Sequence, residues 1–315
     1  MSDIRGIHHV TAIAGDPQEN VDFYNGLLGL RLVKRSVNQD DPGTYHLFYA
    51  DGAGHPGSDL TFFPWAHLAP GKAGPGITTE VAFAVPAGAL EFWEERLGKA
   101  DAQLGQREER FGERVLPFTD PHGLALALVE TDDDREFTPW DRSPISLTFQ
   151  IRRIHKVRVC ERVLDPTASV LQELLGFTLL GEDGEWRRYA PPGGGSGRLV
   201  DVRVASDEAP GRMGRGSVHH VAFRVADEEV QRRVRARVDA ARLRPTPVID
   251  RFWFRSVYFL EPGGVLFELA TDGPGFAVDE DAERLGERLV LPPWLESKRH
   301  DIEAGLPPIR MPMRS

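Results

Sequence analysis

Two pairs of adjacent histidines are the residues of this sequence best suited to bind a metal ion. His8-His9 and His219-His220 each stand near the start of a strand-like stretch, and Glu268 lies in a third such stretch, VLFELA. One imidazole from each pair and this carboxylate would give a 2-His-1-carboxylate set, which binds Fe(II) on one face and leaves the opposite coordination positions open for substrate and O2. The pattern therefore predicts metal-assisted oxygen chemistry at one site.

These side chains can meet only if the fold brings distant segments together, and an internal repeat indicates how. Four segments, at about 4–64, 76–131, 147–205 and 216–272, each follow the order strand, helix, then two or three strands. The turns DPHG and EPGG precede the last strands of the second and fourth segments, and their glycines suit the positive φ that such turns require. We therefore expect an α+β fold of four βαβββ modules.

The length of 315 residues suggests about two domains, and the 41% of apolar residues are enough to give each a core. We expect an N-terminal domain at 1–143 with modules one and two, and a C-terminal domain at 144–272 with modules three and four. The remaining tail, 273–315, contains a stretch with helical spacing, VDEDAERLGER.

Composition excludes several classes of function. A net charge of -10 disfavours contact with nucleic acid. The start MSDIRGIHHV lacks the long apolar run of a signal or membrane-spanning segment, so we expect a cytoplasmic protein without a membrane partner. Cys160 is the only cysteine, which rules out an internal disulfide, and its apolar setting predicts a packed thiol.

The four modules are not equivalent at the positions that could bind metal. When they are aligned on their turns, His9 and His220 correspond to Glu80 in module two and Lys156 in module three. At the position of Glu268 the other modules carry different residues: Thr61, Ala127 and Asp201. We therefore expect one metal site between modules one and four, and a second, metal-free sheet from modules two and three.

Strand parity selects one histidine of each pair, because successive side chains point to opposite faces of a sheet. His220 shares a face with Ala222 and Arg224, whereas His219 shares one with apolar residues that suit a helix-facing core. We take His9, His220 and Glu268 as the ligands, and His8 and His219 as neighbours that fix their orientation. A divalent cation would also satisfy a carboxylate placed in an otherwise apolar strand.

The sequence resembles the vicinal oxygen chelate superfamily, which includes glyoxalases, bleomycin resistance proteins and extradiol dioxygenases. The likeness is greatest to its ring-cleaving dioxygenases of the hydroquinone and chlorohydroquinone 1,2-dioxygenase type. It extends over nearly the whole chain, from GIHHVTAIAGDPQENVDFY and YHLFYADGAGHPGSDLTFFP to GSVHHVAFRV and YFLEPGGVLFELATDGPGF. The resemblance implies that the modules form two cup-shaped mixed β-sheets with the helices packed outside.

The resemblance also implies a function: a ring-cleaving dioxygenase that inserts O2 into a hydroquinone- or catechol-like aromatic. Fe(II), or alternatively Mn(II), would be bound by His9, His220 and Glu268. The residues expected to line or support the pocket are Tyr258, Arg251, His8, Thr11 and His219. Tyr258 or a neighbouring histidine would move protons, and Arg251 or Arg255 would steady an anionic oxygen. A homodimer or larger homo-oligomer is expected on the same ground.

Two alternatives share this fold. A glyoxalase-type isomerase or lyase would need a fourth metal ligand at the end of module one, where Thr61 stands. A metal-free sequestering protein would bind an aromatic ligand in a stacked cleft. Among the other histidines, His46 is not favoured for the pocket and His155 is interpreted as structural. The histidines expected to be solvated are His55, His67, His122 and His300.

Overall fold

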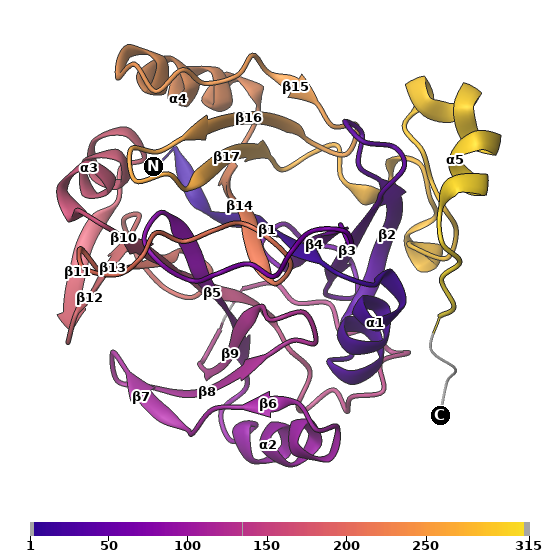
Figure 1. The fold of residues 1–315 in the computed structure, drawn as a ribbon, viewed down its shortest axis with the longest axis horizontal. Helices are drawn as coiled ribbons and strands as arrows, with labels where there is room; N and C mark the ends of the chain where they lie inside the picture. The colour runs from indigo at the N-terminus through magenta and orange to yellow at the C-terminus, as the bar shows by residue number, and fades with distance from the viewer. Residues whose placement is uncertain (1–2, 134, 312–315) are drawn as a thin grey trace.

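The computed structural model describes residues 3–133 and 135–311, and their strands form two mixed β-sheets (Figure 1). Across the first sheet the strands follow in the order β15 (Ile249–Asp250), β16 (Arg255–Leu260), β17 (Leu266–Thr271), β14 (Ser217–Val225), β1 (Ile4–Ala14), β4 (Asp59–Pro64), β3 (Tyr45–Ala50) and β2 (Arg31–Val37). Across the second sheet the order is β11 (Thr178–Asp183), β12 (Trp186–Ala190), β13 (Leu199–Val204), β10 (Arg153–Glu161), β5 (Ile77–Val85), β9 (Ala125–Glu130), β8 (Glu113–Thr119) and β6 (Gln103–Leu104), and β7 (Glu108–Arg110) pairs with β8.

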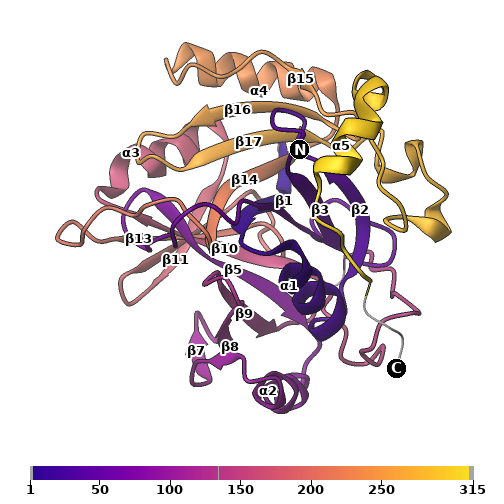
Figure 2. The ribbon, with the colours of Figure 1, turned by 45° about the vertical axis from the view of Figure 1, so that its right-hand side comes forward.

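The strand order confirms how the modules combine. The first sheet joins modules one and four through the antiparallel pair β1–β14, and the second joins modules two and three through β5–β10. The helices cover the sheets from outside: α4 (Glu228–Ala240) lies over β16 and β17, and α2 (Leu90–Lys99) lies beside β8 and β9 (Figures 1 and 2). The expected α+β fold of four βαβββ modules in two curled sheets is therefore correct.

The strand register supports the alignment of the modules. In every module, the aligned position on the last strand pairs with the residue two places after the aligned position on the first strand. The four pairs are Thr11 with Thr61, Ala82 with Ala127, Arg158 with Asp201 and Ala222 with Glu268. Because the register is the same, His9, Glu80, Lys156 and His220 occupy equivalent places in the two sheets.

Side chains alternate between two kinds of surroundings along these strands. On β1, Val10 and Ala12 belong to a large core cluster that is continuous through both sheets and the helices. On the opposite face of the first sheet, a separate apolar cluster contains Phe48, Ala222 and Trp253. This second face, which also carries His9, is called the inner face of the first sheet.

The helices of modules one and three change geometry part way along. Asp16 caps α1 (Pro17–Val21) by accepting from the backbone N–H groups of Gln18 and Glu19, and a π-helical stretch, Asp22–Leu27, follows directly. In module three, α3 (Leu164–Ser169) continues as a π-helical stretch, Val170–Leu174. Sequence periodicity located both helices but not this wider winding.

The helix expected in the tail at VDEDAERLGER is wrong. Only short 3-10 turns occur there, at Phe276–Val278 and Ala282–Arg284, because this segment is tied to β2 instead. The buried ammonium of Lys34 pairs with Asp279 at 2.7 Å and with Glu280 at 2.5 Å. The tail becomes helical later, in a 3-10 stretch, Pro293–Lys298, followed by α5 (Arg299–Gly305), and it packs beside β2 (Figure 2).

The stretch TPVIDRF, residues 246–252, contains little regular structure. Only β15, Ile249–Asp250, pairs there, and the chain then turns through residues 251–254. Among the described residues, no helix is both long enough and apolar enough to cross a membrane.

Candidate metal centre

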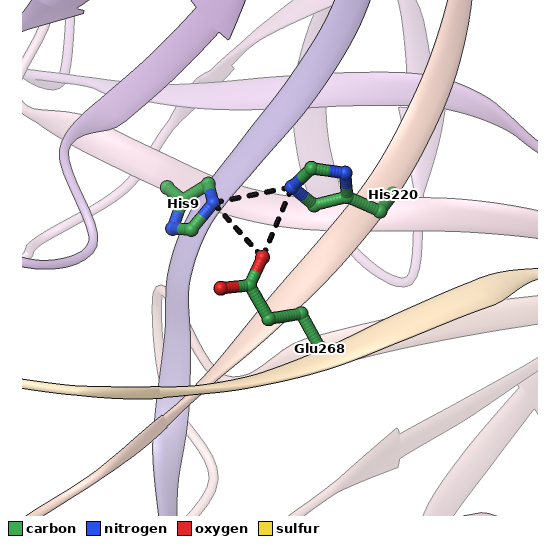
Figure 3. A group of neighbouring side chains, drawn as sticks. All are labelled: His9, His220 and Glu268. Atoms are coloured by element: carbon green, nitrogen blue, oxygen red, sulfur yellow. Dashed lines mark hydrogen bonds and ion pairs between the residues drawn. The ribbon is translucent and has the colours of Figure 1, made fainter. Parts of the chain in front are cut away.

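Three side chains from three neighbouring strands converge on the inner face of the first sheet. His9 comes from β1, His220 from β14 and Glu268 from β17 (Figure 3). The Nε2 atoms of the two histidines are 3.3 Å apart. Glu268 Oε2 lies 3.3 Å from Nε2 of His9 and 3.0 Å from Nε2 of His220. These three residues are called the metal centre below.

The geometry and the donor atoms fit a divalent transition-metal ion. Ligands bound at about 2.1 Å to adjacent corners of an octahedron are separated by about 3 Å. Glu268 Oε1 accepts a hydrogen bond from Ser256 Oγ at 2.5 Å. In contrast, Oε2 is buried and accepts no hydrogen bond from any described residue. A buried carboxylate oxygen without a donor is costly, and a cation between the three atoms would satisfy it.

The charge of the metal centre also suits a cation. His9, His220 and Glu268 are 2%, 4% and 0% exposed, so little solvent screens them. Burial opposes ionisation of Glu268, but the neighbouring His9 and His220 outweigh it and hold its pKa well below the ordinary value. Burial lowers the pKa of His220, which favours the neutral imidazole that binds metals.

A backbone carbonyl determines which nitrogen of His9 is free to bind. His8 Nε2 lies 3.1 Å from the carbonyl oxygen of Thr271, and burial, with repulsion from His9, lowers the pKa of His8 to about 3. The neutral His8 therefore donates from Nε2 to that carbonyl and accepts at Nδ1. His9 Nδ1, 2.9 Å away, must donate to it, which leaves the lone pair of His9 on Nε2, toward Glu268.

His219 is placed against His220 in the same way, without the same anchor. The two Nδ1 atoms are 2.8 Å apart, and burial lowers the pKa of His219 to about 3. Among the described residues, no hydrogen bond to its Nε2 atom is formed; instead its ring lies edge-on to Phe63 and Trp65. The orientation of His220 is therefore less firmly fixed than that of His9.

A small cavity of about 40 Å³ adjoins the two histidines of the metal centre. Much of its wall is aromatic: Phe48, Phe63, Trp253 and Phe254. Tyr258 and Arg251, both predicted site residues, also line it, and the Arg251 guanidinium lies 5.5 Å from the centre of the Tyr258 ring. Burial, with the charge of Glu268, raises the pKa of Tyr258, so its hydroxyl keeps its proton.

His46 lines the same cavity, although the sequence did not favour it. Its Nε2 lies 2.9 Å from Thr61 Oγ1, which lies 2.8 Å from Thr11 Oγ1. Thr11, a predicted site residue, thus supports the pocket through this chain of contacts. Parity would have placed His46, because Tyr45, Leu47 and Tyr49 are buried in the main core and alternate residues must face the cavity.

Arg255 is not a pocket residue, contrary to one expectation. Its guanidinium pairs with Glu228 at the start of α4, on the outer side of the sheet. His122 was expected to be solvated, but its side chain is only 4% exposed and lies 3.1 Å from Glu19 Oε2. His55 is half-buried against Asp51, so the expectation for it was also wrong.

The remaining histidines and the cysteine agree with the sequence analysis. His67 and His300 are exposed. His155 is buried and contacts Glu113 and Ser196, which is a structural role, and Cys160 is a buried free thiol.

The equivalent place in the second sheet is filled by an ion-pair network. Lys156 Nζ lies 2.8 Å from Glu113 and 3.5 Å from Asp201, and Arg188 binds Asp201 through two hydrogen bonds. Glu80, equivalent to His9, pairs with Arg110 at 2.6 Å. In the part of the chain that the structure describes, the metal centre is the only cluster of three or more potential ligands.

Fold and sequence together place the chain in a family. Residues 6–128 and 153–269 match the model described as Glyoxalase/Bleomycin resistance protein/Dioxygenase superfamily, and the chain belongs to this superfamily. The maize glyoxalase I crystal structure shares the fold, with a TM-score of 0.62 over 85% of this chain and 92% of that one at 13% identity.

Nearer relatives carry dioxygenase names. The chain is 43% identical to "Putative ring-cleaving dioxygenase MhqO" of Bacillus subtilis (strain 168), over 97% of both proteins. It is 34% identical to chlorohydroquinone/hydroquinone 1,2-dioxygenase of Sphingobium indicum, over 95% of both. A crystal structure described as a "putative dioxygenase" from Bacillus subtilis subsp. subtilis str. 168 superimposes with a TM-score of 0.94 at 42% identity, covering 99% of each chain.

Proposed function

We propose that this protein is a metal-dependent ring-cleaving dioxygenase that inserts O2 into a hydroquinone- or catechol-like aromatic. The observation that carries the proposal is the convergence of two imidazole nitrogens and a carboxylate oxygen, at 3.0 to 3.3 Å, beside a cavity with aromatic walls. The names of the relatives point to the same class of reaction and to para-diol substrates.

His9, His220 and Glu268 would hold Fe(II), with Mn(II) as the alternative. When bound, such an ion supplies adjacent open positions for a substrate hydroxyl and O2, and a path for electrons between them. The protein contributes a fixed set of ligand atoms. We propose that His8 and His219 hold the two imidazoles in the binding tautomer.

His46 and Tyr258 are the groups best placed to move protons. Burial and repulsion from His9 and His220 lower the pKa of His46 well below its ordinary value, so it is neutral and can accept a hydrogen bond from a substrate hydroxyl. Tyr258 stays protonated and can donate a hydrogen bond to an oxygen that gains negative charge. Thr11 and Thr61 would hold the His46 ring in place.

The aromatic walls would orient the ring of the substrate and exclude water from it. Phe48, Trp253 and Phe254 are almost fully buried and pack in one cluster, so they form a packed apolar surface. Arg251 is the cation that lines the cavity, and we propose that it steadies an anionic oxygen of the substrate.

The test is metal analysis of protein prepared without oxygen, followed by oxygen-electrode assays with hydroquinone and catechol. We expect one iron or manganese per chain and consumption of one O2 per aromatic ring. Turnover of a hemithioacetal without oxygen uptake would support an isomerase instead. Aromatic binding with neither metal nor oxygen uptake would support a sequestering protein.

Replacement of Glu268 by Gln tests the ligand set directly. The amide has nearly the same shape but lacks the negative charge that offsets a cation, so we expect loss of bound metal and of activity. The fold should be retained, as judged by circular dichroism. The exposed His67→Ala variant is the control, and normal metal content in Glu268→Gln would contradict the assignment.

A further inference from the structure

The cavity beside the metal centre is too small in this structure to admit an aromatic ring. It measures about 40 Å³, whereas sites for small organic ligands measure about 300 to 1,000 Å³. The space suits only a few water molecules. An aromatic substrate can therefore reach His9 and His220 only after part of the wall has moved.

Two loops form the part of the wall that is not held within the sheet. One is the β2–β3 connection, residues 38–44, and the other is the turn at residues 251–254 between β15 and β16. Gln39 Nε2 donates to the carbonyl oxygen of Arg251 at 2.9 Å. The Arg251 guanidinium donates to both carboxylate oxygens of Asp40, at 3.2 and 2.8 Å. These contacts among Gln39, Asp40 and Arg251 are called the latch.

The latch lies at a solvent-exposed part of this wall. The side chain of Asp40 is 72% exposed, and exposed ion pairs contribute little to stability because water and salt screen them. The β2–β3 loop is bonded to itself, from Asn38 N to Thr44 O at 2.8 Å, so it can move as a unit. In contrast, His46 and Phe48 lie within β3, and Trp253 is buried in the inner cluster.

We propose that the latch is the gate through which the aromatic ligand enters and leaves the pocket. Opening requires that Arg251 releases Asp40 and that Gln39 releases the backbone of the 251–254 turn. The chemical class of the ligand rests on the function proposed above, whereas the existence of the gate rests only on the small volume of the cavity and the three contacts of the latch.

The first test measures latch opening without metal or ligand. We expect Asp40→Asn to increase amide hydrogen exchange by about 1.4- to 5-fold in peptides that cover 38–44 and 249–254, the range that an exposed ion pair contributes. Glu182→Gln removes a comparable exposed ion pair, with Arg187 at the edge of the second sheet, and should leave both peptides unchanged. Unchanged exchange in Asp40→Asn would overturn the latch.

The second test measures entry. Binding of catechol to the Fe(III)-loaded protein is followed by stopped-flow absorbance of the coloured complex. Catechol is uncharged at neutral pH, so electrostatic steering does not contribute to its rate. We expect association and dissociation to quicken about equally in Asp40→Asn, and added salt to quicken entry in the unsubstituted protein but not in this variant.

The outcomes separate the gate from the function. Faster exchange with an unchanged rate of catechol association would show that the latch opens but is not the route of entry, which would overturn the gate. Faster exchange and faster association, in a protein that consumes no O2, would leave the gate standing and refute the dioxygenase. Oxygen uptake with unchanged exchange and association would support the dioxygenase and overturn the gate.

Discussion

The tautomer of His9 depends on a residue that does not itself reach the cavity. His8 connects the carbonyl of Thr271 to His9 Nδ1, so the pair behaves as one hydrogen-bonded unit. We expect His8→Ala to weaken metal binding about 10- to 100-fold, the usual cost of losing such a partner. Titration of the metal-free protein with Co(II), followed by visible absorbance, measures this. His219→Ala is the matched comparison and should weaken metal binding less. An equal or larger loss of affinity in His219→Ala would contradict the role given to His8.

Substitution of Tyr258 gives a second prediction, which distinguishes a role in proton transfer from a role in metal binding. Tyr258→Phe removes only the hydroxyl, and the ring can keep its packing against His220, at 5.5 Å between ring centres. We expect turnover to fall about 10²- to 10⁴-fold, the range for loss of a proton-transfer group, with unchanged metal content. Loss of metal together with activity would instead assign Tyr258 a structural role.

Sequence reasoning singled out three side chains that the structure brings together, because the repeat supplied information that no single motif contains. Two histidine pairs at equivalent points of two modules, and a carboxylate in one of them, selected modules one and four. His46 was not favoured, although its alternation with apolar residues along β3 was the signal that places it at the cavity. The hydrogen bond from His8 to Thr271 could not be predicted, because its acceptor is a backbone carbonyl, which every residue carries and which no residue type marks.

At the scale of elements, β10 and the β16–β17 turn meet through two buried carboxyl groups. Glu161, at the end of β10, is fully buried, and neither of its oxygens bonds to any described residue. Glu261 in the turn accepts from Val265 N at 2.9 Å and from Thr167 Oγ1 at 2.6 Å, which suits the ionised form. Burial, with repulsion from Glu261, raises the pKa of Glu161 to about 8, so Glu161 is protonated at neutral pH.

This pair predicts that stability falls as the pH rises. Between the ordinary pKa of 4.5 and about 8, Glu161 binds a proton in the folded state but not in the unfolded state. The free energy of unfolding should therefore decrease across this window, by at most about 1.4 kcal/mol per pH unit from this group. Urea unfolding of the native chain and of Glu161→Gln at several pH values measures it. The glutamine variant should lose this part of the slope, and identical slopes would contradict the assignment.

Helices and strands were predicted well where apolar residues recurred at a regular spacing over a long stretch. They were predicted poorly where contacts with distant residues determined the path of the chain. The helix at α4 matches its expected range because acidic residues begin it and apolar residues recur along one side. The tail segment VDEDAERLGER has the same local character, yet it follows β2 because Lys34 binds its acidic residues. No local pattern contains that information. The division into sequential domains at 143/144 stays a prediction, as does the homodimer.

At the scale of the whole molecule, the two sheets have the same topology but carry different polar residues at equivalent positions. The first holds a carboxylate and two imidazoles with an unsatisfied acceptor at their centre. In the second, Lys156 occupies the place of a metal-binding histidine, and its ammonium lies between the carboxylates of Glu113 and Asp201. The Lys156 ammonium therefore supplies positive charge to these carboxylates at the place that a histidine holds in the first sheet.

This difference predicts that the two sheets can be perturbed separately in function but not in folding. Lys156→Ala leaves the two carboxylates with Arg188, and with Arg158 at 3.9 Å from Asp201, and losing one partner of a buried ion pair costs about 3 to 5 kcal/mol. We expect a loss at the lower end of that range in urea unfolding, with metal affinity unchanged. Because one apolar core is continuous through both sheets, the variant should still unfold in a single transition. Two resolved transitions would show that the two sheets unfold separately. Loss of bound metal in this variant would show that the second sheet influences the metal centre.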